Sequence, residues 1–373
     1  MDIRLAALPC ALSAPPYQAG MPISTVAREI GMEPRSIVKL ASNENPMGMS
    51  PLARTEITKL TEDAARYPDP DCFELRNKLA GRLGVSFDNL IVGAGATELI
   101  WLVVRAFLAK GRNAVMSQYA FSLYDSATRA ADGQSIVVPA KEYGHDLDAM
   151  LAAINDQTSV VFVASPNNPT GTALDPDDLE RFFDKVPENV LLVFDEAYRE
   201  FTDPDMRTDL HRLLKRYSNI LVLRTFSKIY GLAGLRVGYG IAETAIIDVL
   251  QRIRSPFSVS SVGQAAAISA LDDREFVEKS YELNRDERAS LSRALAKGSF
   301  LHVPSCANFV LVHVGDGPSV YRGLVRKGVI VRPLVNWGLP QSIRVTIGLP
   351  SENAAFIARL KEILPHGSPK SGA

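Results

Sequence analysis

The sequence predicts an α/β protein with a doubly wound, mostly parallel central sheet, followed by a smaller α+β unit. Short, continuous apolar runs that end in turn residues recur between about residues 90 and 265, as expected of parallel strands buried on both faces. Amphipathic helical stretches separate these runs. After about residue 265 the pattern changes to long charged helices and further strands, which indicates a second unit.

Length and composition agree with a globular protein of two domains. The chain has 373 residues, which is more than one modest core needs. It is 46% hydrophobic and 22% charged, and its net charge of -1 gives no overall attraction to nucleic acid or to anionic membranes. No window approaches the ~18 apolar residues of a membrane span. The net charge and the lack of such a window together lead us to expect neither a nucleic-acid partner nor a membrane partner.

The cysteines and histidines point to a reducing compartment and to no metal. Three widely spaced cysteines argue against a disulfide framework, and five scattered histidines lack the spacing of zinc ligands. The mildly apolar stretch 5–14 follows Asp2 and is interrupted by Pro9, which argues against a secretory signal. A cytoplasmic protein is therefore expected.

The first elements form an arm and a large domain. Residues 1–40 are expected to form an N-terminal arm that packs with the small domain and carries an amphipathic helix at 23–30. The large domain is expected at 41–265, with its clearest helix at 99–108, where apolar residues recur at helical spacing. The expected strands of this domain are 114–117, 160–164, 190–194 and 220–223.

A small C-terminal domain is expected at 266–365. It should contain a long charged helix at 272–295 and strands at 308–314 and 343–347. The final helix is expected to begin at Ser351, a residue type favoured at the N-cap, and to stop before Pro365. The tail, residues 366–373, is expected to be disordered.

Lys228 is the residue most indicative of function. It ends the sequence Thr-Phe-Ser-Lys directly after an apolar run, and Arg236 follows eight residues later. A lysine that forms a Schiff base with pyridoxal phosphate needs hydroxyls and an arginine to hold the phosphate, and a carboxylate to keep the ring nitrogen protonated. Asp195 follows the preceding run and can supply that carboxylate, because ligands gather beyond the carboxyl ends of parallel strands.

Neighbouring runs end in further polar or aromatic groups. Asn168 and Tyr198 can both hydrogen-bond a phenolate oxygen, although the turn that contains Asn168 could be a plain turn. Phe121 could stack on a flat ring, with core packing as an equal alternative. Asp195 followed by Glu196 also resembles the magnesium-binding strand of a P-loop ATPase, but no phosphate-binding G-x-x-x-x-G-K sequence accompanies it.

A phosphate-binding loop is indicated at residues 93–98, where small residues lead into a helix that starts near Thr97. Free backbone amides at a helix N-terminus bind phosphate. The sixth position is Glu98 instead of glycine, and no acidic residue closes a strand about 20 positions on, so a nicotinamide cofactor is not expected. Arg332 and Arg344 lie in or beside apolar strands, where either an anionic ligand or a structural salt bridge could pair with them.

In their order along the chain, these segments resemble the histidinol-phosphate aminotransferase family of fold type I, class I and II, pyridoxal phosphate-dependent aminotransferases. This family includes close relatives that act on aromatic amino acids. The resemblance covers nearly the whole chain. It rests on Ser42-Asn43-Glu44-Asn45-Pro46, Arg66-Tyr67-Pro68, the loop from Gly93 to Glu98, the segment from Asn167 to Gly171, the segment from Asp195 to Tyr198, Ser227-Lys228 with Arg236, and Ile343-Arg344-Val345.

The resemblance implies a role for each matching residue. The catalytic residues would be Lys228 as the Schiff-base lysine, Asp195 as the partner of the ring nitrogen, and Tyr198, which with Asn168 would bind the ring hydroxyl. The cofactor pyridoxal 5'-phosphate would also contact Gly95, Ala96, Thr97, Phe121, Thr225, Ser227 and Arg236, with Tyr67 reaching in from the neighbouring subunit of a homodimer. The substrate contacts would be Tyr17, Asn43, Arg332 and Arg344.

The implied reaction transfers an amino group from histidinol phosphate to 2-oxoglutarate in histidine biosynthesis. Arg344 would grip the carboxylate of glutamate in one half-reaction and the phosphomonoester in the other. Lys228 would move the substrate's α-proton, so its pKa must lie below the usual value near 10.4.

Two local differences from the family pattern leave the substrate open. Residues 258–260 read Ser-Val-Ser, and Asn336-Trp337 precedes Gly338. Trp337 could favour a flat aromatic side chain, so an aromatic amino-acid aminotransferase is the nearest alternative. A pyridoxal phosphate-dependent lyase or decarboxylase and a catalytically silent binding protein are further alternatives, the last opposed by the presence of both Lys228 and Asp195.

Overall fold

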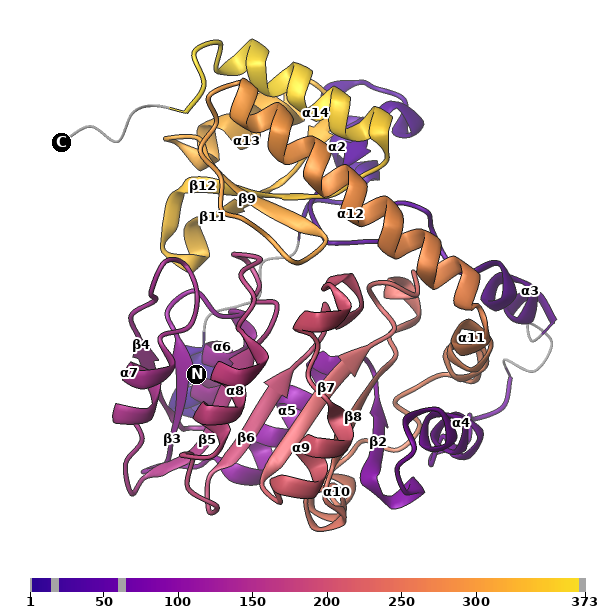
Figure 1. The fold of residues 1–373 in the computed structure, drawn as a ribbon, viewed down its shortest axis with the longest axis vertical. Coiled ribbons are helices and arrows are strands. Elements are labelled where there is room, and N and C mark those ends of the chain that lie inside the picture. The colour runs from indigo at the N-terminus through magenta and orange to yellow at the C-terminus, as the bar shows by residue number, and fades with distance from the viewer. Residues whose placement is uncertain (1, 15–19, 60–64, 369–373) are drawn as a thin grey trace.

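A computed structural model describes residues 2–14, 20–59 and 65–368 (Figure 1). In the view of Figure 1, a large lobe built on a seven-stranded sheet lies below a small lobe built on a three-stranded sheet. The long helix α12 (Arg274–Lys297) runs from the small lobe toward α3 (Pro51–Lys59) and α11 (Ser261–Asp272) at the edge of the large one.

The sheet of the large lobe is mostly parallel, which confirms the predicted fold class. Its strand order is β2-β8-β7-β6-β5-β3-β4, and only β8 runs antiparallel to its neighbours β2 and β7. The strands are β2 (Leu90–Gly93), β3 (Asn113–Ser117), β4 (Gln134–Val138), β5 (Thr158–Ala164), β6 (Leu191–Asp195), β7 (Ile220–Thr225) and β8 (Gly238–Ala242). The four expected strands of this lobe correspond to β3, β5, β6 and β7.

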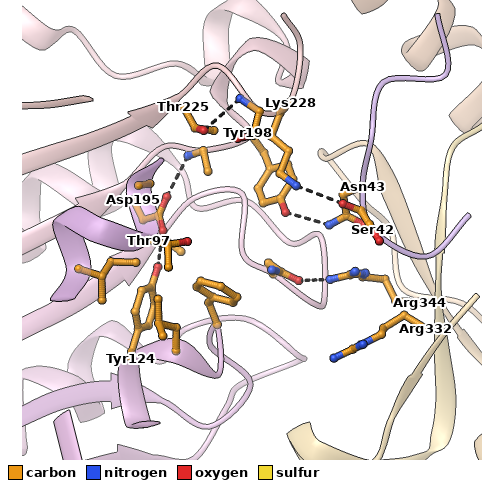
Figure 2. A pocket seen from close by; sticks show the side chains of 18 of the residues that line it. Ser42, Asn43, Thr97, Tyr124, Asp195, Tyr198, Thr225, Lys228, Arg332 and Arg344 are labelled. Atoms are coloured by element: carbon orange, nitrogen blue, oxygen red, sulfur yellow. Dashed lines mark hydrogen bonds between the residues drawn. The ribbon is translucent and has the colours of Figure 1, made fainter. Parts of the chain in front are cut away.

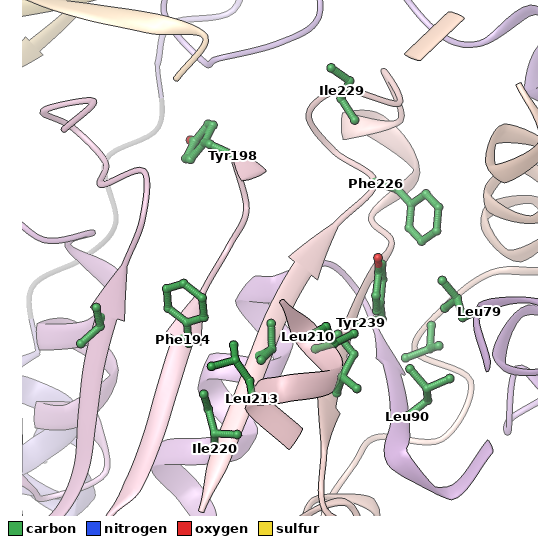
Figure 3. Packing of buried hydrophobic residues seen from close by; sticks show 14 of the residues in the cluster. Leu79, Leu90, Phe194, Tyr198, Leu210, Leu213, Ile220, Phe226, Ile229 and Tyr239 are labelled. Atoms are coloured by element: carbon green, nitrogen blue, oxygen red, sulfur yellow. The ribbon is translucent and has the colours of Figure 1, made fainter. Parts of the chain in front are cut away.

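Helices cover both faces of this sheet, which explains why its strands are apolar throughout. Val160 and Phe162 of β5 pack with the helices on one face, and Val161 and Val163 pack on the other, because strand side chains alternate. The first face is covered by α5 (Ala96–Phe107), α6 (Leu123–Ala130) and α10 (Thr244–Gln251). The second face is covered by α4 (Phe73–Leu83), α7 (Leu147–Ala152), α8 (Pro176–Phe183) and α9 (Leu210–Arg216), and buried residues of α3 and α11 belong to the same cluster. Figure 3 shows Leu79 of α4 and Leu210 and Leu213 of α9 in this cluster.

The small lobe packs an antiparallel sheet against helices. The strands β11 (Arg332–Leu334), β12 (Leu339–Thr346) and β9 (Phe309–His313) lie in that order. The buried side chains of β9 and β12 form one cluster with those of α12, α13 (Gly317–Arg326) and α14 (Pro350–Ile363). Within the described residues, the short 3-10 helices are Ile3–Ala6, Pro34–Ser36, Phe87–Asn89, Arg199–Phe201, Pro204–Met206, Ala233–Leu235 and Val335–Trp337.

The N-terminal segment contacts both lobes. Strand β1 (Val38–Lys39) pairs in parallel with β10 (Val329–Ile330), and Val26 of α2 (Ile23–Ile30) is buried in the same cluster as Ile330. The helix α1 (Pro9–Ser13) instead contacts α6 of the large lobe. The expected arm is thus divided between the two lobes.

The starts of the helices α12 and α14 differ from the sequence-based expectation. The helix expected at 272–295 begins instead at Arg274, because the side chain of Asp273 accepts a hydrogen bond from the amide of Phe276 and caps the helix. Ser351 is not the N-cap of the last helix, which starts one residue earlier at Pro350. Proline suits the first helical position, and Glu352 accepts the amide of Leu349 at 2.7 Å.

The end of the described chain lies against the small lobe. The amide of Ser368 donates to the carbonyl of Ser299 at 3.1 Å, and the rest of the expected disordered tail, 369–373, lies outside the described residues. Among the helices of the described ranges, none combines the length and the hydropathy needed to span a membrane.

Candidate active site

A cavity of about 560 Å³ lies beside the carboxyl ends of β5, β6 and β7, with small-lobe residues on its other side (Figure 2). It brings together residues that are far apart in the sequence. Of the expected site residues, Asn43, Ala96, Thr97, Phe121, Asn168, Asp195, Tyr198, Thr225, Ser227, Lys228, Arg236, Arg332 and Arg344 line it. Gly95 adjoins the cavity through Arg236, Tyr67 does not line it, and Tyr17 lies outside the described residues.

Strand order explains why these side chains meet. β5, β6 and β7 are neighbours in the sheet, and Asp195 is level with Ala164 on one side and Leu223 on the other. The chain leaves each strand at the same edge, so the polar residues that follow the strands converge. The expected gathering of these three strand ends is confirmed.

Lys228 projects its amine into the cavity from the segment after β7. Its Nζ donates to the carbonyl of Ser42 at 3.2 Å and lies 5.5 Å from the centre of the Tyr198 ring. Burial, and after it the nearby Arg344 charge, are the main causes that lower the pKa of this amine from 10.5 to about 7. The protein itself therefore favours the neutral amine that proton transfer requires.

Asp195 is held by two donors at the end of β6. Its Oδ1 accepts the amide of Ala197 at 3.0 Å, and its Oδ2 accepts the hydroxyl of Tyr124 at 2.6 Å. Burial raises the pKa of this carboxyl, against the effect of the two hydrogen bonds. A cationic ring nitrogen in the cavity would offset the cost of the buried charge.

Sequence reasoning missed Tyr124. It lies three residues after Phe121, and their rings meet edge to face with centres 5.7 Å apart. The spacing of three residues across the start of α6 was the available signal, since such residues share a helix face. Its contact with Asp195 joins positions 71 residues apart, which no local pattern reveals.

A cradle for a phosphate group forms where β2 leads into α5. Gly95 is the N-cap of α5 and has a φ of +80°, and a Cβ there would lie 2.6 Å from Nη2 of Arg236. A Cβ at Gly238 would lie 2.4 Å from the amide nitrogen of Ala96. The guanidinium of Arg236 also donates to Oγ of Ser227 at 3.3 Å. Helix-terminal amides, a hydroxyl and an arginine thus converge, as anion binding requires.

Glu98, which breaks the dinucleotide fingerprint, has a structural role in this cradle. Its carboxylate accepts the amide of Ala94. A Cβ at Gly93 would lie 2.8 Å from the same carboxylate. Glu98 therefore fixes the loop ahead of α5.

Two arginines reach the cavity from the small-lobe sheet. Arg344 of β12 donates to the carbonyl of Ala41 at 2.8 Å and to Oδ1 of Asn168. Arg332 of β11 lies with its guanidinium 5.5 Å from the centre of the Trp337 ring. Both arginines are more than nine-tenths buried, and both line the cavity, which suits them to an anionic ligand.

Trp337 and Asn43 connect the walls of the cavity. Nε1 of Trp337 donates to the carbonyl of Ala120 at 3.1 Å, which links the small lobe to the residue before Phe121. Nδ2 of Asn43 donates to the hydroxyl of Tyr198 at 2.8 Å and so orients the phenol.

Within the described ranges, no group of three or more His, Cys, Asp or Glu side chains is placed to hold a metal ion.

Comparison with known proteins gives consistent matches over most of the chain. The profile of the family described as aminotransferase class I and II matches residues 35–360. The chain is 50% identical over 353 residues to histidinol-phosphate aminotransferase 2 of Ralstonia nicotianae and to histidinol-phosphate aminotransferase 1 of Cupriavidus pinatubonensis, in each case covering 94% of both chains. The crystal structure of histidinol-phosphate aminotransferase from Sinorhizobium meliloti in complex with pyridoxal-5'-phosphate is 28% identical, with a TM-score of 0.87, covering 97% of this chain and 99% of that one.

Proposed function

We propose, from the premise that this chain belongs to the class I and II aminotransferase family, that it transfers the amino group of histidinol phosphate to 2-oxoglutarate. The enzyme is a pyridoxal 5'-phosphate-dependent aminotransferase that uses amino and oxo-acid substrates. The observation that carries the proposal is the buried amine of Lys228 in one cavity with a phosphate cradle, the Asp195 carboxylate and two arginines.

The residues of the cavity fit this cofactor. The cradle at Gly95, Ala96 and Arg236 suits its phosphate. Because Gly95 has no Cβ, the guanidinium of Arg236 can lie directly beside the loop. Asp195 suits the ring nitrogen and Phe121 the face of the ring. Bound pyridoxal phosphate supplies an electron sink for the charge left on the substrate's α-carbon.

Lys228 would move the proton in this reaction. Its pKa of about 7 leaves a large share of the amine neutral near neutral pH, so the amine can accept the α-proton and deliver it again. Substitution of Lys228 by alanine is expected to abolish turnover while the protein stays folded. Asp195 would stay ionised and hold the opposite end of the cavity.

Arg344 and Arg332 would bind the anionic end of each substrate. A guanidinium can grip a carboxylate or a phosphomonoester with two parallel hydrogen bonds, so the same residues can serve both half-reactions. The contacts of Arg344 to Ala41 and Asn168 hold its fork in place. Asn43 would contact the substrate beside Tyr198, and Tyr17 keeps its predicted role as a substrate contact.

An aromatic amino-acid aminotransferase is the second candidate. The observation that favours it is the indole of Trp337, which lines the cavity beside Arg332 and could pack against a flat side chain. A lyase or decarboxylase on the same fold would share Lys228 and Asp195. It differs in releasing carbon dioxide or a cleavage product without an oxo-acid acceptor.

Steady-state kinetics with product analysis tests the assignment. The cofactor-loaded enzyme is given 2-oxoglutarate and either histidinol phosphate, phenylalanine or tyrosine, and glutamate and carbon dioxide are measured. We expect kcat/KM for histidinol phosphate to exceed that for the aromatic acids by at least about a hundredfold, because a phosphomonoester presents more negative charge and more acceptor oxygens to the two arginines than the single carboxylate of an aromatic acid does. Equal or reversed values would transfer the assignment to the second candidate.

The larger assembly belongs to the same proposal. A homodimer with shared active sites would bring Tyr67, which is 83% exposed here and stacked on Phe257, into the neighbouring cavity. We retain 41–265 as the cofactor-binding domain, 266–365 as the small domain and 1–40 as the arm. A cytoplasmic location stays a prediction.

A further inference from the structure

We propose that Tyr124 is a positioning residue that holds Asp195 ionised and aimed into the cavity, so that the proton of the cofactor pair stays on the ring nitrogen. This inference rests on the proposed function, because it concerns the same site. Tyr124 would act through Asp195, without taking part in the proton transfer at the α-carbon.

The contact between the two side chains is short and fully enclosed. The hydroxyl of Tyr124 donates to Oδ2 of Asp195 at 2.6 Å, while the amide of Ala197 donates to Oδ1 at 3.0 Å. Tyr124 has no exposed surface and Asp195 is 7% exposed. Because each carboxylate oxygen has one fixed donor, the carboxylate cannot rotate without breaking a hydrogen bond (Figure 2).

The ring of Tyr124 is itself held rigidly. It stacks on Phe162 of β5 with ring centres 4.5 Å apart and an angle of 6° between the planes. It also meets the edge of Phe121, the residue expected to cover the face of the cofactor ring. One side chain thus touches both groups that would set the position of that ring, its face and its nitrogen.

The hydrogen bond from the phenol is one of several influences on the pKa of Asp195. Burial and the neighbouring Glu196 raise the pKa of Asp195, whereas the hydrogen bonds from Tyr124 and Ala197 and the Lys228 charge lower it. The pKa of Tyr124 is itself raised well above its ordinary value by burial and by the Asp195 and Tyr198 groups, so the phenol remains a donor at working pH. The phenol hydroxyl therefore opposes protonation of the carboxylate throughout that range.

Removal of this hydroxyl has a defined consequence. A carboxylate that loses a donor binds a proton more tightly, so the proton shared with the ring nitrogen moves toward Asp195. A ring with a neutral nitrogen withdraws electrons less well, and the lysine-linked nitrogen of the bound cofactor then holds its own proton more firmly. Both the rate of the chemical step and the pH midpoint of the cofactor's visible spectrum should change.

The test compares Tyr124→Phe with Tyr217→Phe. Tyr217 is a matched control, because it is also buried and its hydroxyl donates to a carboxylate, that of Asp184 at 2.7 Å, outside the cavity. For Tyr124→Phe we expect kcat to fall about tenfold, with KM within about twofold of the wild-type value. The pH midpoint of the visible spectrum should rise by about one unit, because a shift of that size corresponds to the free energy of one hydrogen bond to a charged group. Tyr217→Phe should lose similar thermal stability and leave both readouts unchanged.

Two further measurements make the outcome decisive. Tyr124→His, which keeps an N–H donor, should return the spectral midpoint to near its wild-type value. If Tyr124→Phe does not fold, the donorless Tyr124→Met takes its place, and a wild-type midpoint in that variant would likewise overturn the role of Tyr124. Cofactor-free Tyr124→Phe should bind pyridoxal phosphate several-fold more weakly than the wild type. Identical midpoints in Tyr124→Phe and Tyr217→Phe, with an active wild type, would overturn the role of Tyr124. A wild type that neither binds pyridoxal phosphate nor transaminates would instead overturn the proposed function.

Discussion

At the scale of single residues, burial of Lys228 has two opposite effects. It favours the neutral amine that proton transfer requires, and it lowers the stability of the folded protein at pH values where the amine is protonated. Its pKa is about 7 in the folded protein and near 10.5 when unfolded. Between these values the unfolded chain binds a proton that the folded chain does not, so stability rises with pH across this window. Below pH 7 the cofactor-free protein bears the full cost of the buried charge.

Replacement of Lys228 by methionine should remove that cost. Cofactor-free Lys228→Met is expected to exceed the wild type in free energy of unfolding by about 2 kcal/mol at pH 6, allowing for the part of the side chain that solvent reaches, with the difference vanishing near pH 10. Urea denaturation of both proteins at pH 6, 8 and 10 measures it. A constant difference across this range would mean that the amine is not the cause.

Arg344 makes a second prediction at this scale. Arg344→Lys keeps the charge but loses the planar fork, so KM for both histidinol phosphate and 2-oxoglutarate should rise, by about a hundredfold, since two hydrogen bonds to an anion are weakened. Steady-state kinetics in both directions would check this. Arg359→Lys is the control, because Arg359 pairs with Glu362 on the exposed face of α14. A rise in only one KM would contradict the dual role.

At the scale of elements, the loop from β2 into α5 is the part most constrained by ligand binding. Gly95→Ala would place a methyl group 2.6 Å from Arg236, whereas Gly111→Ala, at a φ of +84°, meets nothing within 4 Å. Both substitutions cost about 1 kcal/mol of backbone strain. Only Gly95→Ala should weaken pyridoxal phosphate binding, by at least about tenfold, as measured by equilibrium titration of the cofactor-free proteins. Equal affinities of the two variants for pyridoxal phosphate would contradict a phosphate-binding role for this loop.

The elements also show how far the sequence could predict the site. Lys228, Asp195 and Asn168 were predicted as site residues because each follows an apolar run in the sequence. The ends of neighbouring parallel strands meet at one edge of a sheet, so these residues were expected to lie together. The pairing of β8 antiparallel to both β2 and β7 had no such signal, since strand order depends on long-range contacts. Tyr124 of α6 was missed for the same reason, because its partner Asp195 lies at the end of β6, 71 residues further along the chain.

Trp337 shows a different limit. Its unusual identity was recognised, but the hydrogen bond from its indole to Ala120 joins residues 217 positions apart and depends on how the lobes meet. A departure from the pattern of the family that the chain resembles can indicate that a residue is special without indicating its contact. Likewise, Glu98 was noted only as a mismatch to a motif, whereas its carboxylate holds the loop by binding the amide of Ala94.

At the scale of the whole molecule, the exposed stack of Tyr67 on Phe257 should lie at the interface of a dimer with shared sites. Mixing inactive Lys228→Ala with impaired Tyr67→Ala and allowing subunits to exchange tests this arrangement. A mixed dimer then contains one site with both native residues, so activity should recover to about a quarter of the wild-type value, the share expected when half of the dimers are mixed. Failure to recover activity in verified mixed dimers would place Tyr67 and Lys228 of one subunit in the same site.

The half-reaction with the amino donor alone tests the central claim most directly. Cofactor-loaded enzyme is mixed with histidinol phosphate, phenylalanine or tyrosine without an acceptor, and the loss of the visible absorbance of the lysine-bound cofactor is followed at low substrate concentration. We predict rapid bleaching by histidinol phosphate, at least about a hundredfold faster than by either aromatic acid, and return of the colour when 2-oxoglutarate is added. Faster bleaching by phenylalanine or tyrosine would contradict the assignment and would make Trp337, not the arginine pair, the determinant of substrate choice.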